Sequence, residues 1–172
     1  PTVPTWSGEL LPRSFDLSME IARFRGEMEP RLDAPEGEVV QWLMDGFSID
    51  HGSALSLLHY FKEQRAAAGV PNQRRLLVEG YLDPQGNSGV IFHFPFGRRV
   101  NDALSRAYAF LLTQRMGCNI SVSISDDAFL LMASKRIDLA VLPGLLRSGE
   151  LRGVLRRAVK DSEIFKQRFR HV

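Results

Sequence analysis

The sequence predicts an α+β fold with a mainly antiparallel sheet, and three observations predict it. Helical apolar spacing dominates residues 14–69, whereas residues 75–132 hold two pairs of short alternating segments around one helical segment. Turn residues join each pair, which indicates hairpins. An amphipathic stretch over residues 150–160 predicts a C-terminal helix. We therefore expect one domain over 1–172: a helical subregion, residues 1–72, then a ββ-α-ββ unit with C-terminal helices, residues 73–172.

Three helices are expected in the helical subregion, after a proline-rich stretch over residues 1–13. Ser14 is expected to cap a helix that ends near Met28. The stripe that this helix is expected to bury consists of Leu17, Ile21 and Phe24. Pro35 at a first helical position predicts a second helix, and Asp50 is expected to cap the third.

The second subregion should contain four strands and a central helix. The strands are expected over residues 75–82, 89–94, 119–125 and 128–132, and the helix over residues 101–116. Apolar residues alternate within the second and third strands, so one face of the sheet should be buried. Residues 139–146 contain Pro143 and Gly144 and are expected to form a loop that leads to a short helix.

Charge is distributed unevenly along the chain. Residues 1–72 carry 6 Lys or Arg against 11 Asp or Glu, whereas residues 73–172 carry 16 against 9, within a net charge of +2. Of the 22 basic residues, 18 are arginines, which form bidentate pairs with phosphate and stack on bases. This pattern suggests one face for nucleic acid and another turned elsewhere. An ordinary solvated surface with ion pairs is the alternative.

Several classes of protein are excluded by composition. Cys118 is the single cysteine, so neither a disulfide framework nor a multi-thiolate metal site is possible. No apolar run is long enough to span a membrane and no signal peptide opens the chain, so we expect no membrane partner and a cytoplasmic location. The chain begins at Pro1 and stops at Val172 inside a helical pattern, which predicts a piece of a longer polypeptide.

A search for catalytic motifs finds none. The sequence contains no Gly-x-x-x-x-Gly-Lys-Ser/Thr loop and no nucleophile elbow. The histidines are scattered without metal-ligand spacing, and His93 alternates with apolar residues as a structural strand residue would. Asp126 and Asp127 lie between two expected strands, where adjacent aspartates usually form a turn. We therefore expect no catalytic residue, no metal and no cofactor within this segment.

A pair of basic residues lies between the expected second strand and the expected central helix. Gly97 allows a sharp turn there, and Arg98 and Arg99 follow it beside a helix N-terminus that presents free N–H groups. Two arginines at such a terminus form a credible phosphate clamp. In the alternative, one arginine pairs with Asp102 or another carboxylate and the other is solvated. The residues alone leave both open.

A second candidate for binding is Trp6, in the segment Pro4-Thr5-Trp6-Ser7-Gly8-Glu9, which is expected to be extended. The segment has no helical stripe in which the indole would be buried. Two fates are open for the side chain: it plugs the domain core, or it offers a stacking platform to a nucleobase.

Three stretches of the chain resemble one family. Phe96-Gly97-Arg98-Arg99-Val100-Asn101-Asp102-Ala103-Leu104-Ser105-Arg106-Ala107 is similar to a signature of the large helicase-related (Lhr-type) superfamily 2 helicases, in the DEAD/H-associated region that follows their motor domains. Trp6-Ser7-Gly8-Glu9 with Pro12-Arg13-Ser14 is similar to the start of that region. Glu163-Ile164-Phe165 with Arg168-Phe169-Arg170-His171 is similar to its late helical motif. Ser7 departs from the pattern, since members often carry arginine there.

The resemblance implies a domain of an ATP-dependent, 3′-to-5′ translocating DNA helicase, with DNA repair as an expected process. ATP and Mg²⁺ would be bound by upstream RecA-like domains, which with a winged helix would be partners in the same chain. The domain itself would hold single-stranded DNA, or RNA, beside the motor. The residues that the resemblance assigns to nucleic-acid binding are Trp6, Arg98, Arg99, Asn101, Arg168 and Arg170. The alternative is a scaffold that packs the motor domains and touches DNA little, with the acidic half as its docking surface.

Overall fold

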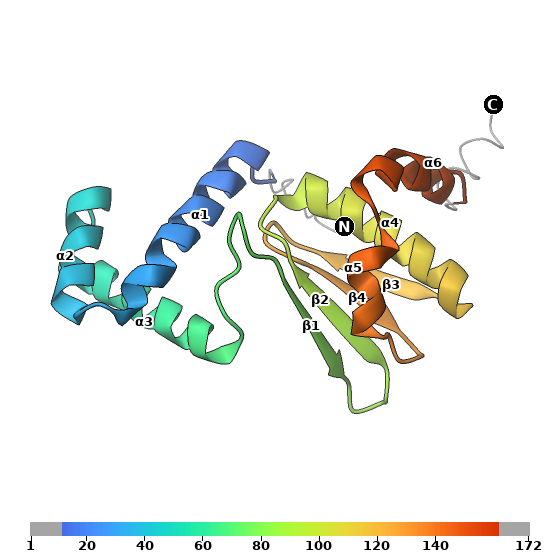
Figure 1. Ribbon diagram of the computed structural model, residues 1–172, viewed down its shortest axis with the longest axis horizontal. Helices are drawn as coiled ribbons and strands as arrows, with labels where there is room; N and C mark the ends of the chain where they lie inside the picture. Colours follow the sequence, from blue (N-terminus) through green and yellow to red (C-terminus); the bar gives the residue numbers. More distant parts are fainter. Residues whose placement is uncertain (1–11, 162–172) are drawn as a thin grey trace, which may run out of the picture.

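The computed structural model describes residues 12–161, which form a helical unit beside an α/β unit (Figure 1). The helical unit comprises α1 (Phe15–Met28), the 3₁₀ helix η1 (Glu29–Asp33), α2 (Glu36–Phe47) and α3 (His51–Ala67). The α/β unit comprises β1 (Leu77–Leu82), β2 (Ser88–His93), α4 (Arg98–Met116), β3 (Ile120–Ile124), β4 (Phe129–Ala133), η2 (Leu139–Val141), α5 (Leu142–Leu145), η3 (Ser148–Glu150) and α6 (Leu151–Asp161). The predicted α+β class is confirmed.

The four strands form one antiparallel sheet in the order β1-β2-β4-β3, which confirms the predicted hairpins. Phe92 of β2 lies opposite Phe129 of β4, and their rings stack with centroids 4.4 Å apart. These two side chains lie on the face that α4 covers, where they pack with Tyr108 and Leu112. Ile137 of the loop after β4, together with Leu142 and the partly buried Leu145 of α5, completes the same core, so α4, α5 and β1–β4 form one layered unit.

The helical unit has a separate core. Its fully buried members come from all of its helices and from the segment that follows: Met28, Leu32, Val39, Val40, Leu43, Ala54, Leu58, Phe61 and Val70. The predicted caps are confirmed, since Ser14 accepts the N–H of Leu17 and Asp50 accepts the N–H of Ser53. Both are local bonds over three residues, which is why the sequence alone shows them.

The predicted buried stripe of α1 is confirmed only in part. Phe24 packs against the core of the helical unit, but Leu17 is 53% exposed, and the fully buried residues of the helix are Ser18, Ala22 and Met28. The reason lies in the α/β unit, because a Cβ on Gly97 would be only 2.9 Å from the Oγ of Ser18. A small side chain is needed where α1 passes this close to the chain of another element.

Other element boundaries shift by one to three residues. Helix α4 begins at Arg98, three residues before the predicted start, so both arginines of the predicted clamp lie in its first turn. Pro35 is the N-cap of α2 rather than its first helical residue. Pro143 and Gly144 lie within the short helix α5 instead of a preceding loop.

Candidate nucleic-acid interface

Helix α4 starts at a turn that only glycine fits. Gly97 has φ of +83° and ψ of 157°, a region that residues with a Cβ adopt at a cost in strain. The same missing Cβ leaves room for Ser18 and for the carbonyl oxygen of Arg13, which a Cβ would approach to 3.2 Å. Gly97 therefore both turns the chain into α4 and allows the start of α1 to pack against it.

The side chain of Asn101 holds this turn in place through hydrogen bonds from the interior of the fold. Its side chain is fully buried, and Nδ2 donates to the carbonyl oxygens of Phe94, Ser125 and Asp126 at 2.8, 3.2 and 3.2 Å. The amide thus joins the end of β2, the start of α4 and the β3–β4 turn. The structure places this predicted contact residue beneath the arginines, in a supporting position, rather than on the surface.

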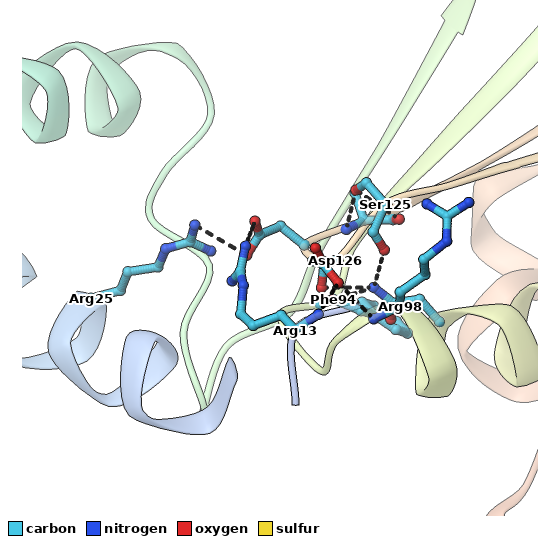
Figure 2. A network of polar contacts seen from close by, with 9 residues as sticks. Arg13, Arg25, Phe94, Arg98, Ser125 and Asp126 are labelled. Atoms are coloured by element: carbon cyan, nitrogen blue, oxygen red, sulfur yellow. Dashed lines mark hydrogen bonds and ion pairs between the residues drawn. The ribbon is translucent and has the colours of Figure 1, made fainter. Parts of the chain in front are cut away.

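Asp126 caps α4 from the turn between β3 and β4, as Figure 2 shows. Its Oδ1 accepts the backbone N–H groups of Arg13 and Arg98, each at 3.2 Å. Its carbonyl oxygen also accepts the N–H of Gly97 at 2.9 Å. A carboxylate of the protein therefore occupies part of the helix N-terminus that the sequence suggests for a phosphate.

Asp127 ties the helical unit to this turn. The guanidinium of Arg13 donates to both of its carboxylate oxygens, at 3.0 and 2.8 Å, and Arg25 of α1 lies 3.3 Å from Oδ1. Partial burial opposes ionisation of Asp127. The hydrogen bond from Arg13 and the charges of Arg25 and Arg13 outweigh that effect, so the pKa of Asp127 lies below its ordinary value. The same hydrogen bond raises the pKa of Arg13. Asp126 and Asp127 thus form a turn, as predicted, and this turn also joins the helical unit to the α/β unit.

Arg98 and Arg99 are both exposed, yet they differ in what holds them. The Arg98 guanidinium donates to the carbonyl oxygen of Ile124 at 2.8 Å, along the end of β3. Arg99 has no side-chain partner within residues 12–161. The alternative in which one of them pairs with Asp102 is not seen, because Asp102 bonds to Arg106 at 2.9 Å, four residues further along α4. Arg99 is therefore the cation at this helix start that is open to a ligand.

The other predicted contact residues lie outside the part of the chain that the structure describes. These are Trp6, Arg168 and Arg170. Their predicted roles are taken up below as proposals.

The remaining polar side chains give no sign of an enzyme site in the described residues. His93 pairs with Glu79 across β1 and β2, with Nε2 and Oε2 2.6 Å apart, so it is a strand histidine with a carboxylate partner. Within residues 12–161 no three His, Cys, Asp or Glu side chains come together as metal ligands. None of the helices described is long and apolar enough to cross a membrane.

A second basic surface was not singled out from the sequence. Arg152, Arg156 and Lys160 of α6 are all exposed and share one side of the helix at i, i+4 and i+8. The sequence does contain the signal, because these three basic residues recur at intervals of four on the side of the helix opposite its apolar residues.

The fold and this junction define an α+β module whose central helix opens with an Arg-Arg-Val-Asn turn held by a β-hairpin. The chain belongs to the DEAD/H-associated family, whose model matches residues 70–172. That match covers the sheet, α4 and the C-terminal helices, and so includes Arg98, Arg99 and Asn101.

Curated proteins similar to this chain are named as helicases. The chain is 40% identical to ATP-dependent helicase Lhr-Core protein 2 of Thermococcus barophilus over 100% of its length, and 38% identical to ATP-dependent helicase Lhr-Core of Methanothermobacter thermautotrophicus over 99%. It spans 20% of the length of each of these curated relatives. The resemblance to Lhr-type helicases seen in the sequence is therefore confirmed.

A solved structure has the same fold over almost the whole chain. It is that of the Mycobacterium smegmatis helicase Lhr bound to ssDNA and AMP-PNP, with a TM-score of 0.74 and 26% sequence identity. The match covers 99% of this chain and 21% of the helicase.

Proposed function

We propose that this chain is an accessory single-strand-binding domain of an Lhr-type, ATP-dependent 3′-to-5′ DNA helicase, and that it holds the tracking strand beside the motor. The observation that carries the proposal is the structural match over 99% of the chain to a helicase bound to ssDNA. The net positive charge of residues 73–172 supports it, because phosphate contacts dominate non-specific nucleic-acid affinity.

Arg99 is the residue through which the described part of the domain binds a phosphate. Its side chain is exposed and unpaired within residues 12–161, and it lies in the first turn of α4, where the helix dipole favours an anion. Arg98 stands beside it, oriented by Ile124. Phosphates are the same whatever the base, so this contact suits a motor that moves along any sequence.

Trp6, Arg168 and Arg170 bind the same strand in this proposal. Trp6 stacks on a base of the strand, which is a contact tolerant of sequence because every base has a π-face. Arg168 and Arg170 add phosphate contacts. Asn101 acts indirectly, by fixing the turn that presents Arg98 and Arg99.

The partners and cofactors of the proposal lie outside this chain. ATP and Mg²⁺ are bound by RecA-like domains of the same polypeptide, and a winged helix completes the motor. The helicase works in the cytoplasm on DNA, with RNA strands as a second class of substrate. The chain spans about a fifth of its curated relatives, which leaves room for those domains in a longer protein.

The salt dependence of strand binding tests the role of Arg99. In the full-length helicase, Arg99→Gln should weaken binding of single strands of any sequence and reduce the slope of log affinity against log salt by about 0.7, the value for one lost phosphate contact. Arg115→Gln is the matched control, because it removes an exposed arginine from the last turn of the same helix. Equal slopes for wild type and Arg99→Gln, with a lower melting temperature, would make Arg99 a structural residue.

The variant Trp6→Ala tests whether the indole stacks on a nucleobase or is buried in the domain core. A lost base stack should cost about 1–3 kcal/mol of strand affinity and impair unwinding without changing the melting temperature. A lost core plug should instead cost about 3–5 kcal/mol of folding stability. A large fall in melting temperature, with strand affinity intact in the folded fraction, rules out the stacking role.

A scaffold that packs the motor domains is the second candidate, and one observation favours it. Large apolar side chains are exposed on the helical unit: Phe15, Leu17, Phe47 and Tyr60. The α/β unit also exposes large apolar side chains, among them Tyr81 and Leu82, and such side chains on either unit are typical of a surface that another domain covers. A scaffold predicts weak salt dependence and no effect of Arg99→Gln, so the titration above decides between the two.

A further inference from the structure

Helix α6 carries a stripe of cations that the fold does not use. Arg152, Arg156 and Lys160 follow one another at intervals of four residues, so their Cα atoms span about 12 Å along one side of the helix. All three side chains are exposed. The apolar side of α6 is centred on the buried Val154 and faces the rest of the α/β unit. The cationic side is therefore turned outward by the packing of the helix itself.

This stripe opposes the local stability of its own helix. Like charges four residues apart repel one another, and the stripe contains two such pairs. Arg152 also lies in the first turn, where the positive end of the helix dipole disfavours a cation and where α6 has no acidic residue, whereas Lys160 lies in the last turn, where the dipole favours it. No carboxylate within residues 12–160 pairs with any of the three. An arrangement that is unfavourable for the helix alone suggests an anionic partner outside it.

The position of α6 links the stripe to the start of α4. The two helices pack together, and the guanidinium of Arg157 lies 5.8 Å from the centre of the Phe110 ring. Phe110 follows Arg99 by eleven residues on α4, which is three helical turns, so both lie on the same side of that helix. Figure 1 shows α6 lying along α4. The helix that bears the stripe thus packs on the same side of α4 as the proposed phosphate contact.

We propose that Arg152, Arg156 and Lys160 form a second contact for the single strand, which binds phosphates of nucleotides beyond those held at the start of α4. This inference rests on the proposed function and extends it to another surface. Exposed basic side chains suit a backbone that must slide past, because a phosphate recurs at every nucleotide and carries no sequence information. The contact contributes affinity and salt dependence but no base preference.

The test compares two triple variants of the full-length helicase. Arg152→Gln, Arg156→Gln and Lys160→Gln together remove the stripe and keep good helix formers. The control triple, Arg74→Gln, Arg115→Gln and Arg136→Gln, removes the same charge from exposed sites outside α6. Binding of single-stranded DNA is measured over a range of salt concentrations, with melting temperatures in parallel. The stripe variant should lose about 2 from its log–log salt slope, at about 0.7 per contact, and the control should lose far less.

Each result has a distinct meaning. An unchanged slope in the stripe variant, or an equal loss in both triples, overturns the inference while the role of Arg99 stands. A wild-type helicase with no salt-dependent strand binding overturns the proposed function itself. A lower melting temperature of the multidomain protein with unchanged strand affinity would show that the stripe binds an acidic protein surface instead, because removing the repulsion within α6 should by itself raise it. If the triple variant does not fold, Arg156→Gln alone should still lose about 0.7 from the slope.

Discussion

At the scale of single residues, Asp127 does the most to join the two units. It accepts two hydrogen bonds from Arg13 and lies within ion-pair distance of Arg25. All three side chains are mostly shielded, with exposed fractions of 36, 21 and 17%, so the charges are less screened than at an open surface. The junction is therefore electrostatic, and its strength should depend on pH.

Asp127→Asn should destabilise the fold at neutral pH by about 1–3 kcal/mol, because it removes hydrogen bonds between charged groups. The pKa of Asp127 is lowered on folding, so its contribution is present above the unfolded value near 3.8 and is lost as pH falls through the folded pKa. Urea denaturation at pH 7 and below pH 4 checks this. The gap between wild type and variant should close at low pH.

Asp102→Asn is the control for that measurement. Asp102 forms an exposed i, i+4 pair with Arg106, which should contribute about 0.5 kcal/mol or less. A loss at Asp102 as large as that at Asp127 would mean that the junction is no stronger than a surface pair.

At the scale of elements, the sequence predicts well whatever short-range chemistry determines. Hairpin turns and strand alternation predict all four strands, and the caps at Ser14 and Asp50 act on N–H groups three residues away. The start of α4 was placed three residues late because its cap, Asp126, comes from a turn 28 residues further along the chain. The exposure of Leu17 and the burial of Ser18 on α1 could not be predicted for the same kind of reason, since Ser18 packs closely against the distant Gly97.

The candidate nucleic-acid interface shows the same difference between short-range contacts, which the sequence predicts, and long-range contacts, which it does not. Arg98 and Arg99 could be found from their position after a strand and a glycine, and the structure does place them at an exposed helix start. The burial of Asn101 could not be read, because two of its three acceptors lie 24 and 25 residues away. Long-range contacts of this kind have no signal in local spacing.

Gly97→Ala should be costly for two independent reasons: its backbone conformation and its contact with α1. The expected loss is about 3 kcal/mol of stability, with the start of α4 displaced. Gly117→Ala is the reference, because Gly117 has φ of +62° and ψ of 33°, the ordinary left-handed conformation, and open space around its Cβ. That variant should lose about 1 kcal/mol. Thermal melting of both variants gives the comparison, and equal losses would show that neither the close approach to Ser18 nor the unusual ψ of Gly97 matters for stability.

At the scale of the whole molecule, the two hydrophobic cores are separate and the contact between the units is mostly polar. Each unit buries its own apolar residues, so the Asp126–Asp127 turn sets their relative position rather than a shared core. A domain built in this way has two units whose surfaces can bind different partners. Both candidate functions use that division, and they differ in which surface carries nucleic acid.

The chain on its own should not hydrolyse ATP. Phosphoryl transfer needs a cradle for the triphosphate and carboxylates that hold Mg²⁺. The sequence has no Walker-type loop, and residues 12–161 bring no metal-binding cluster together. Turnover by purified chain should therefore equal the buffer blank, with or without single-stranded DNA, whereas the full-length helicase should show strand-stimulated hydrolysis. Turnover that follows the protein peak through gel filtration and scales with its concentration would place an active site within these 172 residues and reject the accessory role.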